Sequence, residues 1–210
     1  MKYVYLHGFA SGPNSTKARF FARKFAEFGL SLEIPALDEG DFEHLTVTKQ
    51  LSVIARACGA GPAVLIGSSL GGYLAAAYAA RHPEIQCLVL MAPAFRFARR
   101  WQTWLGEAEM ERWRQTGYRV FSHYGSGSER KLFYTLIEDG LQYEEFPAAP
   151  QPALVLHGAK DDVVPLGLSE LFTQNEPRRR LVVVESGHEM TDSVEQLWVE
   201  TAAFLELAKV

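Results

Sequence analysis

The stretch PAVLIGSSLGGYLAAAYAAR, residues 62–81, decides the expected fold. Residues 62–67 form an apolar run that predicts a fully buried strand, and residues 70–81 are rich in small residues and predict a helix. Gly67, Ser69 and Gly71 join them in the pattern G-x-S-x-G, a sharp strand-to-helix turn that exposes a serine hydroxyl. Because a helix N-terminus favours developing negative charge, we predict Ser69 as a nucleophile. The alternative is that Ser69 only caps the helix.

Strands and helices alternate along the rest of the chain. Further strands are predicted at residues 2–6, 31–34, 85–91, 152–157 and 181–184, and helices at residues 16–29, 44–59 and 193–209. Apolar strands that alternate with helices are typical of a parallel sheet covered on both faces. The 210 residues therefore predict one α/β domain, doubly wound, with a mostly parallel sheet of about six strands.

Residues 94–150 interrupt this alternation, because they separate two predicted strands by more than an ordinary crossover needs. The segment is rich in aromatic residues, and their spacing suggests two or three helices with a turn at residues 125–128. Long excursions inside a compact domain usually serve a function. We predict a helical cap or lid insertion; the alternative is a crossover helix with additional packing.

Composition excludes several classes of function. The net charge of −4 and the lack of a clustered basic face argue against nucleic-acid and anionic-membrane partners. The two cysteines, Cys58 and Cys87, lack the spacing of a disulfide framework or a zinc site, so we expect no metal and no cofactor. No apolar run reaches the roughly 20 residues that span a bilayer, and no leader sequence is visible. We expect a cytoplasmic protein; the oligomeric state stays open.

A serine hydroxyl needs a base to become a good nucleophile, and His188 is the best candidate among six histidines. It follows the last predicted strand, in a loop where open α/β sheets place their sites. The others are interpreted as surface residues (His44, His82), as a peripheral residue of the cap (His123), or as structural residues whose rings bond nearby backbone (His7, His157).

The third member of such a site is a carboxylate between the serine and the histidine in chain order. Asp161 and Asp162 both follow the strand at residues 152–157, and spacing alone leaves the choice between them open. Asp38 and Asp192 are weaker candidates, because the first precedes the serine and the second is expected to cap the last helix.

Acyl transfer also needs two backbone N–H groups that stabilise an oxyanion. The residue after the nucleophile, Leu70, supplies one, and Phe9 in the loop HGFASGP (residues 7–13) is the natural second donor. The alternative for this loop is an ordinary turn. A phosphate-binding loop is less favoured, since the loop has neither a Walker lysine nor a G-x-G-x-x-G pattern.

Together, LHGF (6–9), GSSLGG (67–72), HGAKDDVVP (157–165) and SGH (186–188) resemble the α/β-hydrolase superfamily. The stretches YLHGFASGPNSTKA and GSSLGGYLA are similar to small YqiA-like esterases. The resemblance implies Ser69 as nucleophile, His188 as base, Asp161 as acid through HGxxDxxVP, and Phe9 and Leu70 as oxyanion donors. Many larger members carry additional strands before the HG loop, so we expect a minimal sheet.

The resemblance also implies an activity, the hydrolysis of a small-molecule carboxylic ester with a short to medium acyl chain. Aromatic residues of the cap suggest an apolar pocket. The alternatives are an acyl-protein or acyl-CoA thioesterase, less readily a peptidase, and a binding protein with an unused triad.

Overall fold

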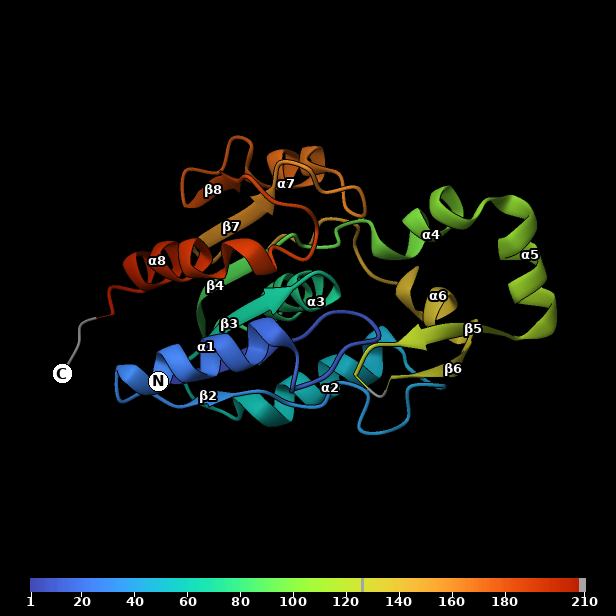
Figure 1. Cartoon of the computed structure of the whole chain (residues 1–210), viewed down its shortest axis with the longest axis horizontal. Helices are drawn as coiled ribbons and strands as arrows, with labels where there is room; N and C mark the ends of the chain where they lie inside the picture. The colour runs from blue at the N-terminus through green and yellow to red at the C-terminus, as the bar shows by residue number, and fades with distance from the viewer. Residues whose placement is uncertain (126, 208–210) are drawn as a thin grey trace.

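The computed structural model describes residues 1–125 and 127–207. Its centre is a six-stranded parallel sheet in the order β2-β1-β3-β4-β7-β8 (Figure 1). The strands are β1 (Lys2–Leu6), β2 (Leu32–Glu33), β3 (Ala63–Ser68), β4 (Ile85–Met91), β7 (Ala153–Gly158) and β8 (Arg179–Val184). The predicted fold class is therefore confirmed, and each of these strands lies at or near the stretch expected from apolar runs.

Two helices cover one face of the sheet, α1 (Thr16–Glu27) and α8 (Val194–Phe204). Trp198 of α8 packs against Phe21 and Phe25 of α1, with ring centroids 5.9 and 5.4 Å apart. The predicted last helix extended to residue 209, but α8 ends at Phe204, and residues 208–210 lie outside the described residues.

The opposite face is covered by α2 (Val47–Cys58), α3 (Leu70–Ala79) and α7 (Leu166–Thr173). Helix α3 is buried along its whole length, as its small residues allow. Burial on both faces explains why β3, β4 and β7 are apolar without alternation. The core therefore consists of two layers, one on each side of the sheet.

The insertion at residues 94–150 is not wholly helical. It contains α4 (Phe97–Leu105), α5 (Glu107–Thr116), an antiparallel hairpin of β5 (Tyr118–His123) and β6 (Ser128–Phe133), and α6 (Thr135–Gly140). The sequence-based expectation missed the hairpin, because an isolated pair of half-exposed strands carries only a weak pattern. The predicted turn at residues 125–128 falls at the junction of β5 and β6, but Ser128 already belongs to β6, and residue 126 is outside the described residues.

An aromatic cluster joins the insertion to the domain. The Trp101 ring of α4 lies 5.4 Å from Trp113 and from Phe121, and 5.5 Å from Phe9 in the loop after β1. The buried Trp113 indole donates a hydrogen bond to the Leu132 carbonyl at 3.0 Å, which ties α5 to the hairpin. Figure 1 shows the insertion at the end of the sheet toward which the strands point.

Candidate active site

The turn between β3 and α3 holds Ser69 in a strained conformation, with φ 54° and ψ −117°. A non-glycine residue at positive φ is uncommon and persists only where its surroundings enforce it. The neighbouring glycines are required by space: an added Cβ would lie 2.3 Å from the Gly71 carbonyl oxygen at Gly67, and 2.1 Å from the Leu6 carbonyl oxygen at Gly71. The tight packing of this turn against β1 therefore presents the serine hydroxyl at the carboxyl end of the sheet.

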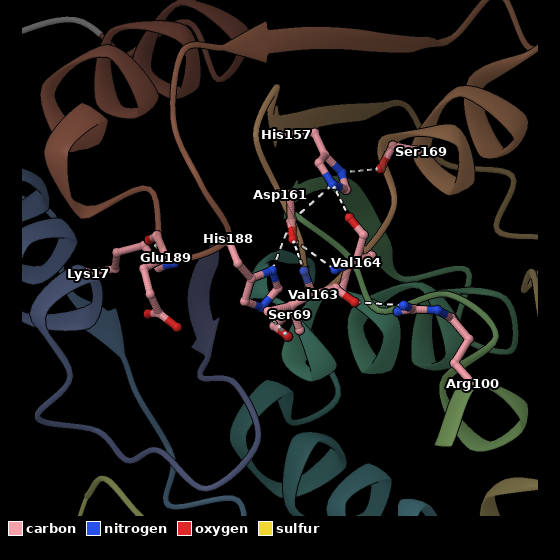
Figure 2. Close-up of polar contacts among 10 residues, drawn as sticks. All are labelled: Lys17, Ser69, Arg100, His157, Asp161, Val163, Val164, Ser169, His188 and Glu189. Carbon is pink, nitrogen blue, oxygen red and sulfur yellow. Dashed lines mark hydrogen bonds and ion pairs between the residues drawn. The ribbon is translucent and has the colours of Figure 1, made fainter. Parts of the chain in front are cut away.

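The structure brings Ser69, His188 and Asp161 together in a chain of contacts (Figure 2). His188 Nε2 lies 3.0 Å from Ser69 Oγ, and His188 Nδ1 lies 2.8 Å from Asp161 Oδ2. The three residues follow β3, β8 and β7, so they meet where parallel strands end together. The Asp161 side chain is fully buried and that of His188 is 12% exposed, which shields their contact from water.

The other carboxylates considered lie elsewhere. Asp162 is exposed. Asp38 lies near the hairpin, with its Oδ2 3.8 Å from His123 Nε2. Asp192, expected to cap the last helix, instead accepts hydrogen bonds from the hydroxyls of Ser186 and Ser193. The Ser186 bond braces the loop that carries His188.

Asp161 is held by donors on both of its oxygens. Oδ1 accepts hydrogen bonds from the backbone N–H groups of Val163 and Val164, at 2.9 and 2.8 Å. Oδ2 faces both His188 and His157, whose Nε2 lies 3.1 Å away. Burial alone would raise the pKa of Asp161, but the bonds from His157, His188 and Val164 outweigh it and hold the pKa well below its usual range. Asp161 is therefore ionised at neutral pH.

His157 differs in part from its expected structural role. Its ring is fully buried, and its Nε2 lies 2.9 Å from the Val164 carbonyl, which fits the expected bond to backbone. Its contact with Asp161 was missed, although the i, i+4 spacing of the two residues in HGAKD is a usable signal. Because Nε2 faces a carbonyl and a carboxylate, it must carry a proton, and Nδ1 pairs with the Ser169 hydroxyl at 2.7 Å.

Lys17 is a second feature that sequence reasoning missed. Its side chain is buried in α1, and its Nζ donates a hydrogen bond of 2.5 Å to the carbonyl of Glu189, next to His188 (Figure 2). Burial lowers the pKa of Lys17. Nothing in the local sequence of a helix indicates that one lysine turns inward toward a loop 172 residues away.

The remaining histidines lie outside this chain of contacts. His7 Nδ1 lies 3.0 Å from the Gly8 carbonyl, as expected for a ring bonded to backbone, and His7 Nε2 accepts the Leu37 N–H at 3.2 Å. His44 and His82 each pair with a nearby carboxylate at 2.7 and 2.9 Å. His123 is buried in the hairpin, away from Ser69.

The predicted oxyanion donors are the backbone N–H groups of Phe9 and Leu70. Neither donates a hydrogen bond to any residue in the described part of the chain. Both residues line a cavity of about 140 Å³ that also contains Ser69. Most of its wall is formed by aromatic and aliphatic side chains of the insertion and of the loop after β7, which carries Asp161. The lining residues are Phe9, Ser69, Leu70, Ala94, Phe97, Arg100, Trp101, Trp104, Val163 and Val164.

Residues 1–125 and 127–207 contain no cluster of three or more histidine, cysteine or acidic side chains that could hold a metal ion. Cys58 and Cys87 are both free thiols. None of the helices described is long and apolar enough to cross a membrane.

A family model described as "Uncharacterised protein family (UPF0227)" matches residues 2–206. The chain belongs to the UPF0227 family. No curated protein matches its sequence.

Solved structures give the fold of this UPF0227 protein. Alpha/beta hydrolase domain-containing protein 10 from mouse has a TM-score of 0.82 at 20% identity, over 98% of this chain and 89% of that one. Est1E from Butyrivibrio proteoclasticus has a TM-score of 0.71 at 19% identity, over 96% and 88%. A structure from work on the metagenome-derived lipolytic enzymes LipS and LipT has a TM-score of 0.70 at 20% identity, over 98% of this chain and 93% of that one. The fold expected from the resemblance, that of α/β hydrolases, is confirmed by these structures, and the family match agrees with the predicted likeness to small YqiA-like proteins.

Proposed function

We propose that this UPF0227 protein is a serine hydrolase that cleaves carboxylic esters through an acyl-enzyme. One observation carries the proposal: the unbroken line from Ser69 Oγ through the His188 ring to a buried carboxylate, at 3.0 and 2.8 Å. Nucleophile, base and orienting acid in this geometry are the recurring arrangement of serine hydrolases on unrelated folds.

In the proposed reaction, His188 Nε2 takes the proton of Ser69 as Oγ attacks the ester carbonyl. The N–H groups of Phe9 and Leu70 then stabilise the oxyanion of the tetrahedral intermediate. Protonated His188 passes its proton to the leaving alcohol. His188 then takes a proton from a water molecule that attacks the acyl-enzyme, and it returns that proton to Ser69 Oγ as the acid is released. Asp161 stays ionised and stabilises the imidazolium, which fits its lowered pKa.

The cavity supports a small substrate with an apolar part. Its volume of about 140 Å³ and its aromatic wall suit a short to medium acyl chain. Among proteins of the same fold, Est1E was solved with ferulic acid bound, and LipS and LipT are described as lipolytic. The small-molecule substrate and the cytoplasmic location expected from the sequence are part of this proposal.

Hydrolysis of 4-nitrophenyl acetate, butyrate and octanoate, together with labelling by a fluorophosphonate, tests the proposal. We expect Ser69→Ala to abolish labelling and to lower turnover by at least about 10³-fold. Ser68→Ala is the matched control, because Ser68 is the adjacent serine and should keep its labelling. No turnover of any ester and no labelling of the wild type would refute the proposal and favour a binding protein.

The same machinery attacks thioesters, so the panel pairs each oxygen ester with the thioester of the same acyl group. A strong preference for the thioester would convert the proposal into the thioesterase alternative. Cleavage of amide substrates at a comparable rate would favour a peptidase.

A further inference from the structure

Three arginines lie at the start of α4, Arg96 just before its first residue and Arg99 and Arg100 within it, and Arg100 differs from the other two. Arg96 and Arg99 both form ion pairs with Glu145. Arg100 forms no salt bridge in the described part of the chain, although the charge of Asp161 acts on it at longer range, and its Nη2 donates a hydrogen bond of 2.6 Å to the carbonyl of Val163 (Figure 2). Arg100 therefore brings a positive charge that no salt bridge neutralises from the insertion to the loop that carries Asp161.

This charge lies in the wall of the cavity that contains Ser69. Apart from the serine, the other side chains of the wall are aromatic or aliphatic, so Arg100 is the one charged residue among the described residues that line the cavity. Partial burial lowers the pKa of Arg100, which reflects the cost of removing a guanidinium from water. A guanidinium stays protonated under such conditions, so the half-buried Arg100 keeps its positive charge in the wall of the cavity, offset only by the attraction of Asp161.

The bond to Val163 leaves donors on Nε and Nη1 that contact no acceptor among the described residues. A planar guanidinium matches a carboxylate with two parallel N–H···O bonds, which are stronger than bonds to neutral acceptors. One cation in the cavity balances one negative charge. A monoanionic carboxylate therefore fits this cavity better than a doubly charged phosphate.

We infer that the substrate is an ester or thioester bearing a free carboxylate, and that Arg100 is the specificity-determining residue that binds this group beside Ser69. The inference rests on the proposed function. It narrows that function to esters whose anionic group fits into the cavity together with the scissile carbonyl.

A different role for Arg100 would be mechanical. Through Val163, it could hold α4 against the loop that carries Asp161, whatever the substrate carries. If Arg100 had only this role, loss of its hydrogen bond to Val163 would lower the turnover of charged and neutral esters in parallel. Loss of a carboxylate-binding group would lower only the turnover of the charged esters.

The test uses two pairs of substrates that differ by a carboxylate in place of a methyl group. Monomethyl glutarate and methyl pentanoate place the charge in the acyl part, and 3-acetoxypropanoate and propyl acetate place it in the alcohol part. Product formation by NMR gives kcat/KM for each ester. The variants are Arg100→Gln and Arg100→Lys, with Arg99→Gln as the matched control, because Arg99 is the neighbouring arginine and lies outside the cavity wall.

We expect the wild type to prefer the charged member of one pair by at least about tenfold, the range of a charge-assisted hydrogen bond. Arg100→Gln should remove that preference, Arg100→Lys should keep part of it, and Arg99→Gln should leave it intact. An unchanged preference in Arg100→Gln, a parallel loss for both members, or no preference in the wild type overturns the inference.

Fluorophosphonate labelling separates this failure from failure of the proposed function. A wild type that is labelled at Ser69 but rejects charged esters is still a serine hydrolase, and only the carboxylate inference is refuted. A wild type that is not labelled refutes both.

Discussion

Replacing Asp161 by asparagine tests the assigned roles most sharply, because the structure dictates how the new side chain must sit. The Val163 and Val164 N–H groups both donate to Oδ1. The asparagine oxygen must therefore occupy the Oδ1 position, since an amide NH₂ there would face two donors. The NH₂ group then takes the place of Oδ2, which in the wild type lies 2.8 Å from His188 Nδ1 and 3.1 Å from His157 Nε2. The N–H of His157 still has the Val164 carbonyl as an acceptor.

A donor at this place reverses the required tautomer of His188. Nδ1 would have to accept a hydrogen bond, so Nε2 would carry the proton and could not take one from Ser69. Restoring the productive tautomer loses a charge-assisted hydrogen bond, about 1.5–3 kcal/mol, and leaves a buried donor unsatisfied, about another 1–3 kcal/mol. The sum of about 3–6 kcal/mol corresponds to a loss of roughly 10²- to 10⁴-fold in kcat.

The assay is steady-state hydrolysis of 4-nitrophenyl butyrate, supported by the rate of fluorophosphonate labelling, which reports the nucleophilicity of Ser69 directly. Asp162→Asn is the control, because it makes the same chemical change at the adjacent, exposed position. We expect the control to keep wild-type kinetics. If Asp161→Asn retained more than about one tenth of the wild-type kcat, the reasoning on tautomer and acid would be wrong.

Three further outcomes follow from the packing around the site. Gly71→Ala should lower the free energy of unfolding in urea by about 3 kcal/mol or more, because the added Cβ meets a carbonyl oxygen of β1 at 2.1 Å. Gly12→Ala, with nothing within 4 Å of its added Cβ, should change it by less than about 0.5 kcal/mol; equal effects would contradict the packing argument. Lys17→Met should lower kcat about tenfold with little change in KM, because the Glu189 carbonyl loses its hydrogen-bond donor and the loop that carries His188 is no longer held in place. A change confined to KM would refute this role. Because the folded-state pKa of Asp161 is lowered, its stabilising contribution is complete above its unfolded pKa near about 4 and is lost as the pH falls through the folded value. Urea unfolding of Asp161→Asn should therefore lose stability less steeply than the wild type as acid is added, and identical acid profiles would exclude the contribution.

Much of the α/β fold around the site could be predicted, because the sequence patterns that specify it are local. Residues 62–81 specify a buried strand, a sharp turn and a helix of small residues, and each property depends on neighbours in the chain. Chain order also selected the serine, the histidine and two adjacent carboxylates as candidates, since parallel strands end at the same edge of a sheet. The choice between Asp161 and Asp162 rested on family resemblance.

The insertion shows where local signals stop. The spacing of its aromatic residues predicted two or three helices with a turn at residues 125–128, yet residues 118–123 and 128–133 pair as a hairpin. The hairpin packs through Phe121 against Trp101 and Trp113, which belong to two different helices. A strand that depends on such partners carries little pattern of its own.

Periodicity, glycine placement and strand order are properties of the chain, so they were enough to predict the parallel sheet, the turn at Ser69 and a short set of residues from which a triad could be drawn. Three contacts became visible only after folding: Asp161 is shared by two histidines, Lys17 holds the loop of His188, and Arg100 brings a charge into the cavity. Those contacts join residues that mostly lie far apart in the chain. Whether a lysine or arginine turns inward depends on which distant acceptor folding brings within about 3 Å, and no local pattern encodes that distance.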